Sequence, residues 1–155
     1  MRFRIDKALE KGASRTRRME WALSLEDLNH DSSEATPLIT LYERRKGGLD
    51  VVILTPGAPS AVIPLTPDYL AEHFQAYAHV IGRMSSASEG DGARSFETLD
   101  YGKKLIHDEA GEAIQEALED HIDLPLATAR RLFTLVFLIL SDLPEHLVKQ
   151  HRTHL

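Results

Sequence analysis

LITLYERRKGGLDVVILTPGAPSAVIPL (residues 38–65) is the stretch that decides the fold. It contains three short apolar runs, at 38–44, 49–54 and 60–65, separated by glycine- and proline-containing turns at 46–48 and 55–59. In the first run Ile39 and Leu41 alternate with other residues, which places them on one face of a strand. Short runs separated by such turns are typical of β-hairpins, so the stretch predicts a three-stranded antiparallel meander. Pro64 cannot donate a ladder hydrogen bond, so the third strand should either lie at an edge of the sheet or end at this residue.

Helices are predicted on both sides of this meander. A first helix, capped by Ser14 or Thr16, should run to about Leu28. After the meander, Thr66-Pro67 is a typical helix start, and the apolar residues that follow have helical spacing (Leu70, Phe74, Tyr77, Ile81).

Two more helices are predicted in the C-terminal half. A long one should extend from Phe96 to about Asp120, and the next from Ala127 to Leu140. The last is apolar nearly all round after Arg131, which indicates a central position. The fold class is therefore α+β: a three-stranded antiparallel meander packed on a bundle of three to four helices.

The length of 155 residues favours a single domain, 1–155. Three of its segments are expected to lack fixed structure because of their composition or position. They are a basic flexible arm at 1–15, a mobile loop at 85–95 and a fraying tail at 151–155.

The composition excludes several classes of protein. The chain has no cysteine, which excludes disulfides and thiolate metal sites and favours a reducing, cytoplasmic location. The N-terminus does not resemble a secretory signal. The longest apolar run, 132–140, would span about 14 Å as a helix, so no membrane segment is predicted. No cofactor and no metal site are predicted either.

Charge is unevenly distributed along the chain. Residues 1–18 carry seven Lys or Arg against two acids, whereas residues 97–123 carry nine acids against two lysines. A basic segment and an acidic helix in one chain suggest that each has a binding partner. The two segments could bind each other, they could bind a second copy of the chain in a homodimer, or each could bind another protein. Nucleic acid is a less suitable partner, because the remainder of the chain is acidic and Phe3 is the sole aromatic residue within 1–18.

KKLIHDEAGE (103–112) is the stretch richest in reactive side chains. His107 could be a general base or metal ligand assisted by Asp108 or Glu109, or a histidine at the edge of the core that bonds to a nearby backbone. On a helix the two acids point ~100° and ~200° away from His107, so a carboxylate partner would have to come from elsewhere. Gly111 costs about 1 kcal/mol against alanine in a helix, which suggests that a backbone or a ligand needs the space.

Two further sets of charged residues are candidate sites. Asp108, Glu112, Glu116 and Asp120 recur every four residues, as either a solvated face or a docking surface. Arg130 and Arg131 lie near the start of a helix, where the helix dipole disfavours cations. They should therefore have anionic partners, either carboxylates such as Asp123 or Asp100, or a bound phosphate or carboxylate.

Several of these stretches resemble one known family. LTP (65–67), LDYGKKLIHDE (99–109), Asp123 and TARRLFTL (128–135) together resemble a bacterial family known as uncharacterised protein family 0262. The resemblance runs from about Leu38 to Leu140 and implies a soluble cytoplasmic protein, but no particular activity. The residues that match the family pattern are Gly102, His107, Glu109, Arg130 and Arg131. The chain departs from that pattern at Asp108-Ala110, where the family typically has Asn and Gly around the shared Glu109.

Two functions remain open on these observations. The first is a small non-catalytic interaction or regulatory module that associates with itself. The alternative is an enzyme or binder of a small phosphorylated or carboxylated ligand, using His107, Glu109, Arg130 and Arg131. The alternative requires His107 and both arginines to open onto one cleft.

Overall fold

The computed structural model describes residues 1–90, 93–141 and 143–148. In these residues the chain forms one sheet and six helices, two of them only four residues long. Their order along the chain is β1 (Arg2–Ile5), α1 (Lys7–Glu10), α2 (Arg15–Leu28), β2 (Leu38–Glu43), β3 (Leu49–Leu54), β4 (Ala61–Leu65), α3 (Pro67–Gly90), α4 (Ala93–Leu118), α5 (Leu126–Leu140) and α6 (Glu145–Val148).

The sheet has four strands rather than the three predicted, in the order β1-β2-β3-β4. The predicted antiparallel meander is present as β2, β3 and β4, with Ile39 paired to Ile53 and Val51 paired to Ile63. The additional strand, β1, runs parallel to β2 and pairs Phe3 with Ile39. Pro64 lies in β4 at an edge of the sheet, as its missing N–H requires.

The prediction of a flexible arm at 1–15 is wrong, because residues 2–5 form β1 and residues 7–10 form α1. Two contacts order this segment. The Phe3 side chain is buried in the core. The Asn29 side chain accepts a hydrogen bond from the Phe3 N–H at 2.9 Å and donates one to the Phe3 carbonyl at 3.0 Å. The segment appeared flexible from the sequence because the residue that anchors it lies twenty-six positions away.

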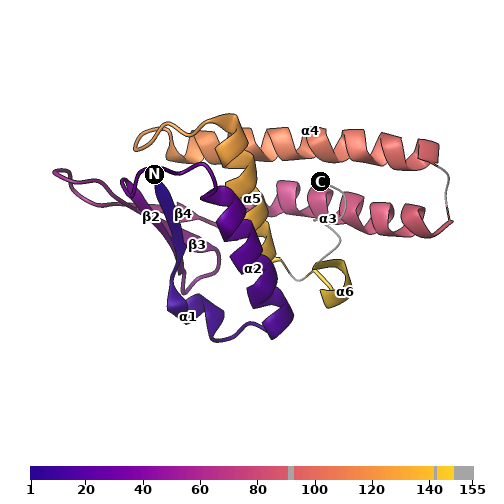
Figure 1. Cartoon of the computed structure of the whole chain (residues 1–155), viewed down its shortest axis with the longest axis horizontal. Coiled ribbons are helices and arrows are strands. Elements are labelled where there is room, and N and C mark those ends of the chain that lie inside the picture. Colours follow the sequence, from indigo (N-terminus) through magenta and orange to yellow (C-terminus); the bar gives the residue numbers. More distant parts are fainter. Residues whose placement is uncertain (91–92, 142, 149–155) are drawn as a thin grey trace.

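The helices form a second layer against one face of the sheet, and α3 and α4 extend from it as an antiparallel pair (Figure 1). The prediction that 127–140 is central is confirmed, since every side chain from Leu132 to Leu138 in α5 is buried. These side chains join the inward-facing strand residues Ile39, Leu41 and Val51 in one core. The protein is therefore an α+β structure of two layers.

The predicted mobile loop at 85–95 is largely helical. α3 continues to Gly90 and α4 begins at Ala93, while residues 91 and 92 lie outside the described residues. Packing of the two helices along each other lengthens both beyond the point where local composition would end them. The predicted fraying tail at 151–155 also lies outside the described residues. Within the described part of the chain, no helix combines the length and apolar character needed to cross a bilayer.

Candidate functional site

His107 points into the interface between α4 and α5. Its ring is 6% exposed, and Nε2 lies 2.6 Å from the hydroxyl oxygen of Thr134 in α5. The Thr134 hydroxyl in turn donates to the Arg130 carbonyl at 3.2 Å. Because a hydroxyl has a single hydrogen to donate, Nε2 of His107 acts as the donor toward Thr134. The histidine thus links two helices inside the core.

Aromatic rings surround His107 on its other sides. The Tyr77 ring from α3 lies 5.3 Å from the His107 ring, centroid to centroid, and the Phe133 ring from α5 lies 6.0 Å away. Tyr77 is fully buried, and its hydroxyl has no well-formed hydrogen bond within the described residues. Burial raises the pKa of Tyr77 well above its usual value, against smaller opposing effects from the Thr134 hydroxyl and the Arg130 charge.

Lys103 is a member of this cluster that the sequence prediction missed. It lies one turn before His107 on α4, is 3% exposed, and places Nζ 5.9 Å from the centroid of the Tyr77 ring. Burial lowers the pKa of Lys103 to about 8, although the nearby Asp100 opposes the shift. The four-residue spacing to His107 was the signal in the sequence that could have identified it. We refer to Tyr77, Lys103, His107 and Thr134 as the interhelical cluster.

Arg130 and Arg131 are both paired with carboxylates on the protein. Nε of Arg130 lies 3.2 Å from Oδ1 of Asp108. The Arg131 guanidinium lies 3.6 Å from Asp27 and 3.7 Å from Asp31, on the side facing α2. Ion pairs were one of the two predicted arrangements, but the proposed partners, Asp123 and Asp100, were wrong.

The predicted ligand-binding residues therefore do not meet at one cleft. His107 is buried between helices, whereas Glu109, two positions along α4, is exposed to solvent. The two arginines pair with α4 on one side and with α2 and its following loop on the other. Nor do three histidine or carboxylate side chains converge as metal ligands anywhere in the described part of the chain.

Gly111 lies where α5 packs tightly against α4. A Cβ atom at this position would lie 2.9 Å from Cγ of Arg130, 3.1 Å from Cδ1 of Leu126 and 3.3 Å from the Arg130 backbone nitrogen. The sequence left open whether a backbone or a ligand occupies the space beside this glycine. The occupant is the first turn of α5.

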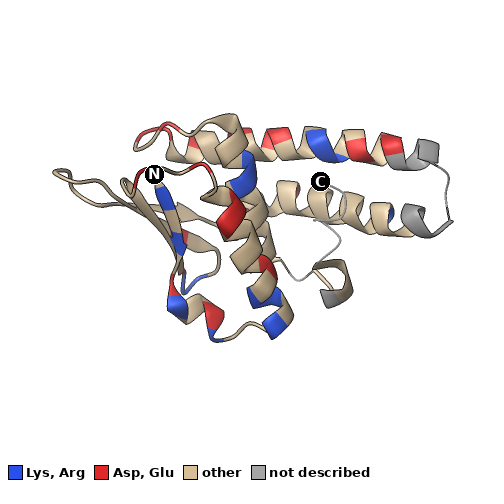
Figure 2. Cartoon of the chain, viewed as in Figure 1, with Lys and Arg blue, Asp and Glu red and all other residues tan. Residues whose placement is uncertain are grey.

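The predicted acidic ladder is exposed along most of its length. Asp108 is half-buried in its pair with Arg130, and Glu112, Glu116 and Asp120 face solvent. The Tyr69 hydroxyl donates to the Ala113 carbonyl at 2.8 Å beside these acids. Burial raises the pKa of Tyr69, and the Glu116 and Glu119 charges add to the effect. Acids mark α4 along one edge of the molecule, whereas cations gather around α1 and the start of α2 at the opposite edge (Figure 2).

These features define a small α+β protein whose polar core residues join helices and whose charges are separated on its surface. The chain belongs to the uncharacterised protein family UPF0262, whose model matches residues 39–141. The resemblance found in the sequence is thereby confirmed over most of the predicted range.

Relatives in several bacteria are similar to parts of this chain. The UPF0262 protein of Methylobacterium radiotolerans is 49% identical over 41 residues, 26% of each chain. That of Novosphingobium aromaticivorans is 48% identical over 44 residues, 28% of this chain and 27% of its own. These two matches thus span about a quarter of each relative's length. That of Azorhizobium caulinodans is 30% identical over 98 residues, 63% of this chain and 56% of its own. No solved structure matches the chain.

Proposed function

We propose that this protein is a non-catalytic interaction module that associates with a second copy of itself through two oppositely charged helix faces. The observation that carries the proposal is an exposed face of α4 on which large apolar residues are followed by carboxylates. Isolated surface apolar residues are common, but an exposed apolar patch continuous with charge is typical of docking surfaces.

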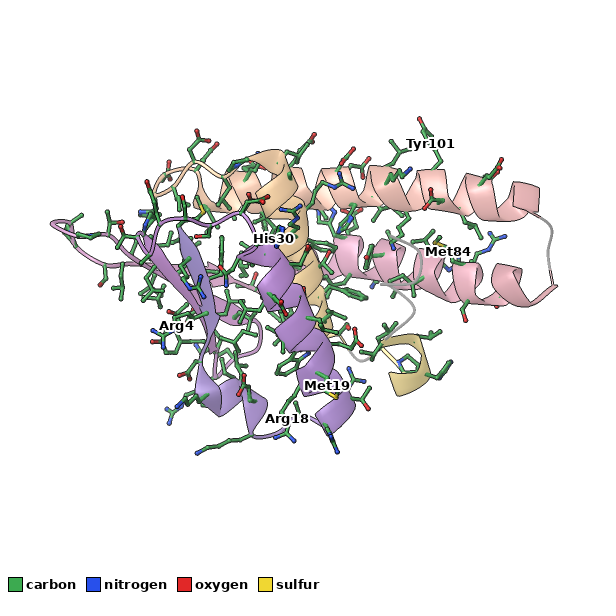
Figure 3. All side chains as sticks on the ribbon, viewed as in Figure 1. Arg4, Arg18, Met19, His30, Met84 and Tyr101 are labelled. Atoms are coloured by element: carbon green, nitrogen blue, oxygen red, sulfur yellow. The ribbon has the colours of Figure 1, made fainter. Side chains whose placement is uncertain are left out.

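The face on α4, which we call the acidic stripe, consists of five exposed residues: Tyr101, Leu105, Glu109, Glu112 and Glu116. Their spacing of three or four places them on one side of the helix. Tyr101 is 66% exposed and Leu105 is 46% exposed, high values for large apolar side chains. Tyr101 projects from α4 on the side away from α3 (Figure 3).

A matching face lies on α2. The basic stripe consists of Arg15, Arg18, Met19 and Leu23, all exposed. Arg18 and Met19 lie three and four residues after Arg15, and Leu23 lies four after Met19, so the set occupies one side of the helix. Met19 is 56% exposed and Leu23 is 40% exposed. Along α2 the charged residues of the stripe come first and the apolar residues second, which is the reverse of their order along α4.

The two stripes are complementary when the helices run antiparallel. In that orientation Arg15 and Arg18 lie opposite Glu116 and Glu112 of a neighbouring α4. Leu23 then lies nearest to Leu105, and Tyr101 lies beside the end of α2. Glu26, which is exposed near the end of α2, then approaches Lys104, which is 66% exposed. Opposite charges thus meet near both ends of the contact, which would give the pairing its specificity.

The proposed pairing is between molecules rather than within one chain. The two charged regions lie at opposite edges of the structure (Figure 2). No ion pair within the described residues joins a cation of 1–18 to a carboxylate of 97–123. Because the two stripes lie at opposite edges, the contact is head-to-tail: α2 of one copy meets α4 of the next, which leads to a ring or an open chain of copies. The absence of cysteine keeps the cytoplasm as the expected location.

The ligand-binding alternative receives no support from the geometry, because its four residues do not share a cleft. His107 bonds to Thr134 inside the core, and both arginines have carboxylate partners. We therefore base the proposed function on the surface of α4 rather than on the histidine.

A charge-swap experiment tests the proposal. One variant reverses the acids (Glu112→Lys with Glu116→Lys), and the other reverses the bases (Arg15→Glu with Arg18→Glu). By sedimentation velocity, the wild type should associate more strongly at low salt than at high salt, since screening weakens charge pairing. Each variant alone should be monomeric, and an equimolar mixture should associate again. A wild type that stays monomeric at low salt, or a mixture that does not recover association, would overturn the proposal.

A further inference from the structure

A pocket of about 450 Å³ lies where three parts of the chain meet. These are the turn between α1 and α2, the turn between β2 and β3, and the last turn of α5. Small-molecule sites commonly enclose about 300–1,000 Å³. The pocket lies at the far end of α5 from Arg130 and Arg131, and it is separate from the acidic stripe.

One wall of the pocket is apolar. It is formed by Leu9, Trp21, Ile139 and Leu140. The Trp21 ring is held in place, because its Nε1–H donates to the Leu138 carbonyl at 3.0 Å and the side chain is only 5% exposed. A rigid ring beside aliphatic side chains can contact an apolar ligand with little loss of side-chain entropy.

Two arginines, Arg17 and Arg44, line the polar part of the pocket. Nη2 of Arg17 donates to the Leu143 carbonyl, and this arginine forms no ion pair with the described residues. Arg44 is held by Asp50, 3.3 Å from its Nε, and by a 3.2 Å bond from Nη1 to the Gly47 carbonyl. A guanidinium has five N–H donors, so each of these side chains keeps donors for a ligand while its position is fixed.

The negative groups around the pocket limit the charge of a ligand that the two arginines could bind. The Glu43 carboxylate lines the same pocket, and the carbonyl end of α5 borders it. Both are negative and oppose the double charge of a phosphate, while two guanidiniums remain suited to one carboxylate. Ser141 also lines the pocket, and its buried hydroxyl has no hydrogen-bond partner among the described residues. Leaving such a hydroxyl unpaired is unfavourable, and a polar ligand group nearby would relieve it.

We propose that this pocket binds an aliphatic monocarboxylate, with the carboxylate on Arg17 and Arg44 and the hydrocarbon chain against Trp21 and Leu140. The apolar wall would contact the hydrocarbon chain of the ligand, and the two arginines would bind its carboxylate. Neither feature is used by the proposed self-association, so the two proposals stand or fall separately.

Trp21 provides a direct readout, because it is the sole tryptophan in the chain and lines the pocket. Octanoate is the probe, and its titration should produce a saturable change in tryptophan emission. Octanol, which has the same chain without the charge, and inorganic phosphate, which has charge without the chain, should each bind at least roughly tenfold more weakly. Equal responses to octanoate and octanol, or a response that never saturates, would mean that the carboxylate is not recognised.

Other arginines supply matched controls for the two cations. Arg17→Met and Arg44→Met should each weaken octanoate binding about tenfold or more, as expected for loss of a charge-assisted hydrogen bond. Arg4→Met and Arg45→Met remove exposed cations outside the pocket and should leave the titration unchanged. Thermal unfolding identifies any variant that fails to fold. If all four folded variants bind octanoate like the wild type, or all four lose binding equally, the assignment of the head group to this pocket is wrong.

Discussion

Nε2 of His107 lies 2.6 Å from the Thr134 hydroxyl oxygen, and this bond connects α4 to α5 inside the core. It gives the histidine a structural role, which was one of the two predicted from the sequence, although its partner is a side-chain hydroxyl rather than a backbone group. Substitutions at this bond and at the residues around it test what each contributes to the stability of the protein.

Thr134→Val removes the hydroxyl and keeps the shape of the side chain. His107 would then have a buried N–H without this acceptor, so the free energy of unfolding should fall by about 1–3 kcal/mol. Urea denaturation measures the change. Thr40→Val is the matched control, because Thr40 is a half-buried residue of β2 with no side-chain hydrogen bond among the described residues. If both variants are equally stable, the His107 bond contributes little.

Lys103 should make stability depend on pH in the alkaline range. Burial lowers its pKa from 10.5 in the unfolded chain to about 8 in the folded protein. Between these values the folded protein has released its proton and the unfolded chain has not. The free energy of unfolding therefore rises with pH across this window, by roughly 1–2 kcal/mol once screening is allowed for.

The Lys103 effect is isolated by comparing variants at each pH. Lys103→Met should remove this rise, whereas Lys104→Met should retain it, because Lys104 is exposed and pairs with Asp100 at 3.3 Å. Ionisable groups that all three proteins share cancel in the difference. The prediction is contradicted if wild type and Lys103→Met have parallel stability curves from pH 7.5 to about 10.

Gly111→Ala should destabilise the protein although alanine is the better helix former. The added methyl would lie 2.9 Å from Cγ of Arg130 and 3.3 Å from its backbone nitrogen, which forces α5 away from α4. We expect a loss of about 1–3 kcal/mol in thermal or urea unfolding. Gly102→Ala on the same helix has no atom within 4 Å of the new methyl, and it should gain about 1 kcal/mol. If Gly111→Ala and Gly102→Ala are equally stable, then moving α5 away from α4 does not lower the free energy of unfolding, and the prediction is wrong.

The apolar part of the acidic stripe should contribute to association but not to folding. Tyr101→Ser with Leu105→Ser removes two exposed side chains, so unfolding should change by less than about 0.5 kcal/mol while self-association weakens several-fold. Leu54→Ser on the exposed face of the sheet is the control and should associate like the wild type. Loss of association in Leu54→Ser alone would instead place the contact on the sheet.

Local patterns were sufficient for most of the secondary structure. The three-run pattern in 38–65 predicted β2, β3 and β4, and Ser14 caps α2 by accepting the Arg17 N–H at 3.2 Å. β1 and the extension of α3 to Gly90 were missed, since each depends on contacts with distant residues rather than on its own composition. The candidate site was predicted in parts. His107 was identified, but Lys103, four residues earlier on the same face, was not proposed as a site residue, because lysines are rarely fully buried.

The sequence by itself determined the α+β class, the meander, the central apolar helix and the separation of charge between the N-terminal segment and α4. These follow from periodicity and turn chemistry, which act over a few residues. Tertiary structure alone decided that the N-terminus adds a strand, that both arginines are occupied by carboxylates and that His107 faces Thr134. Those outcomes depend on which helix faces pack together, and packing is set by the whole core rather than by any one stretch of chain.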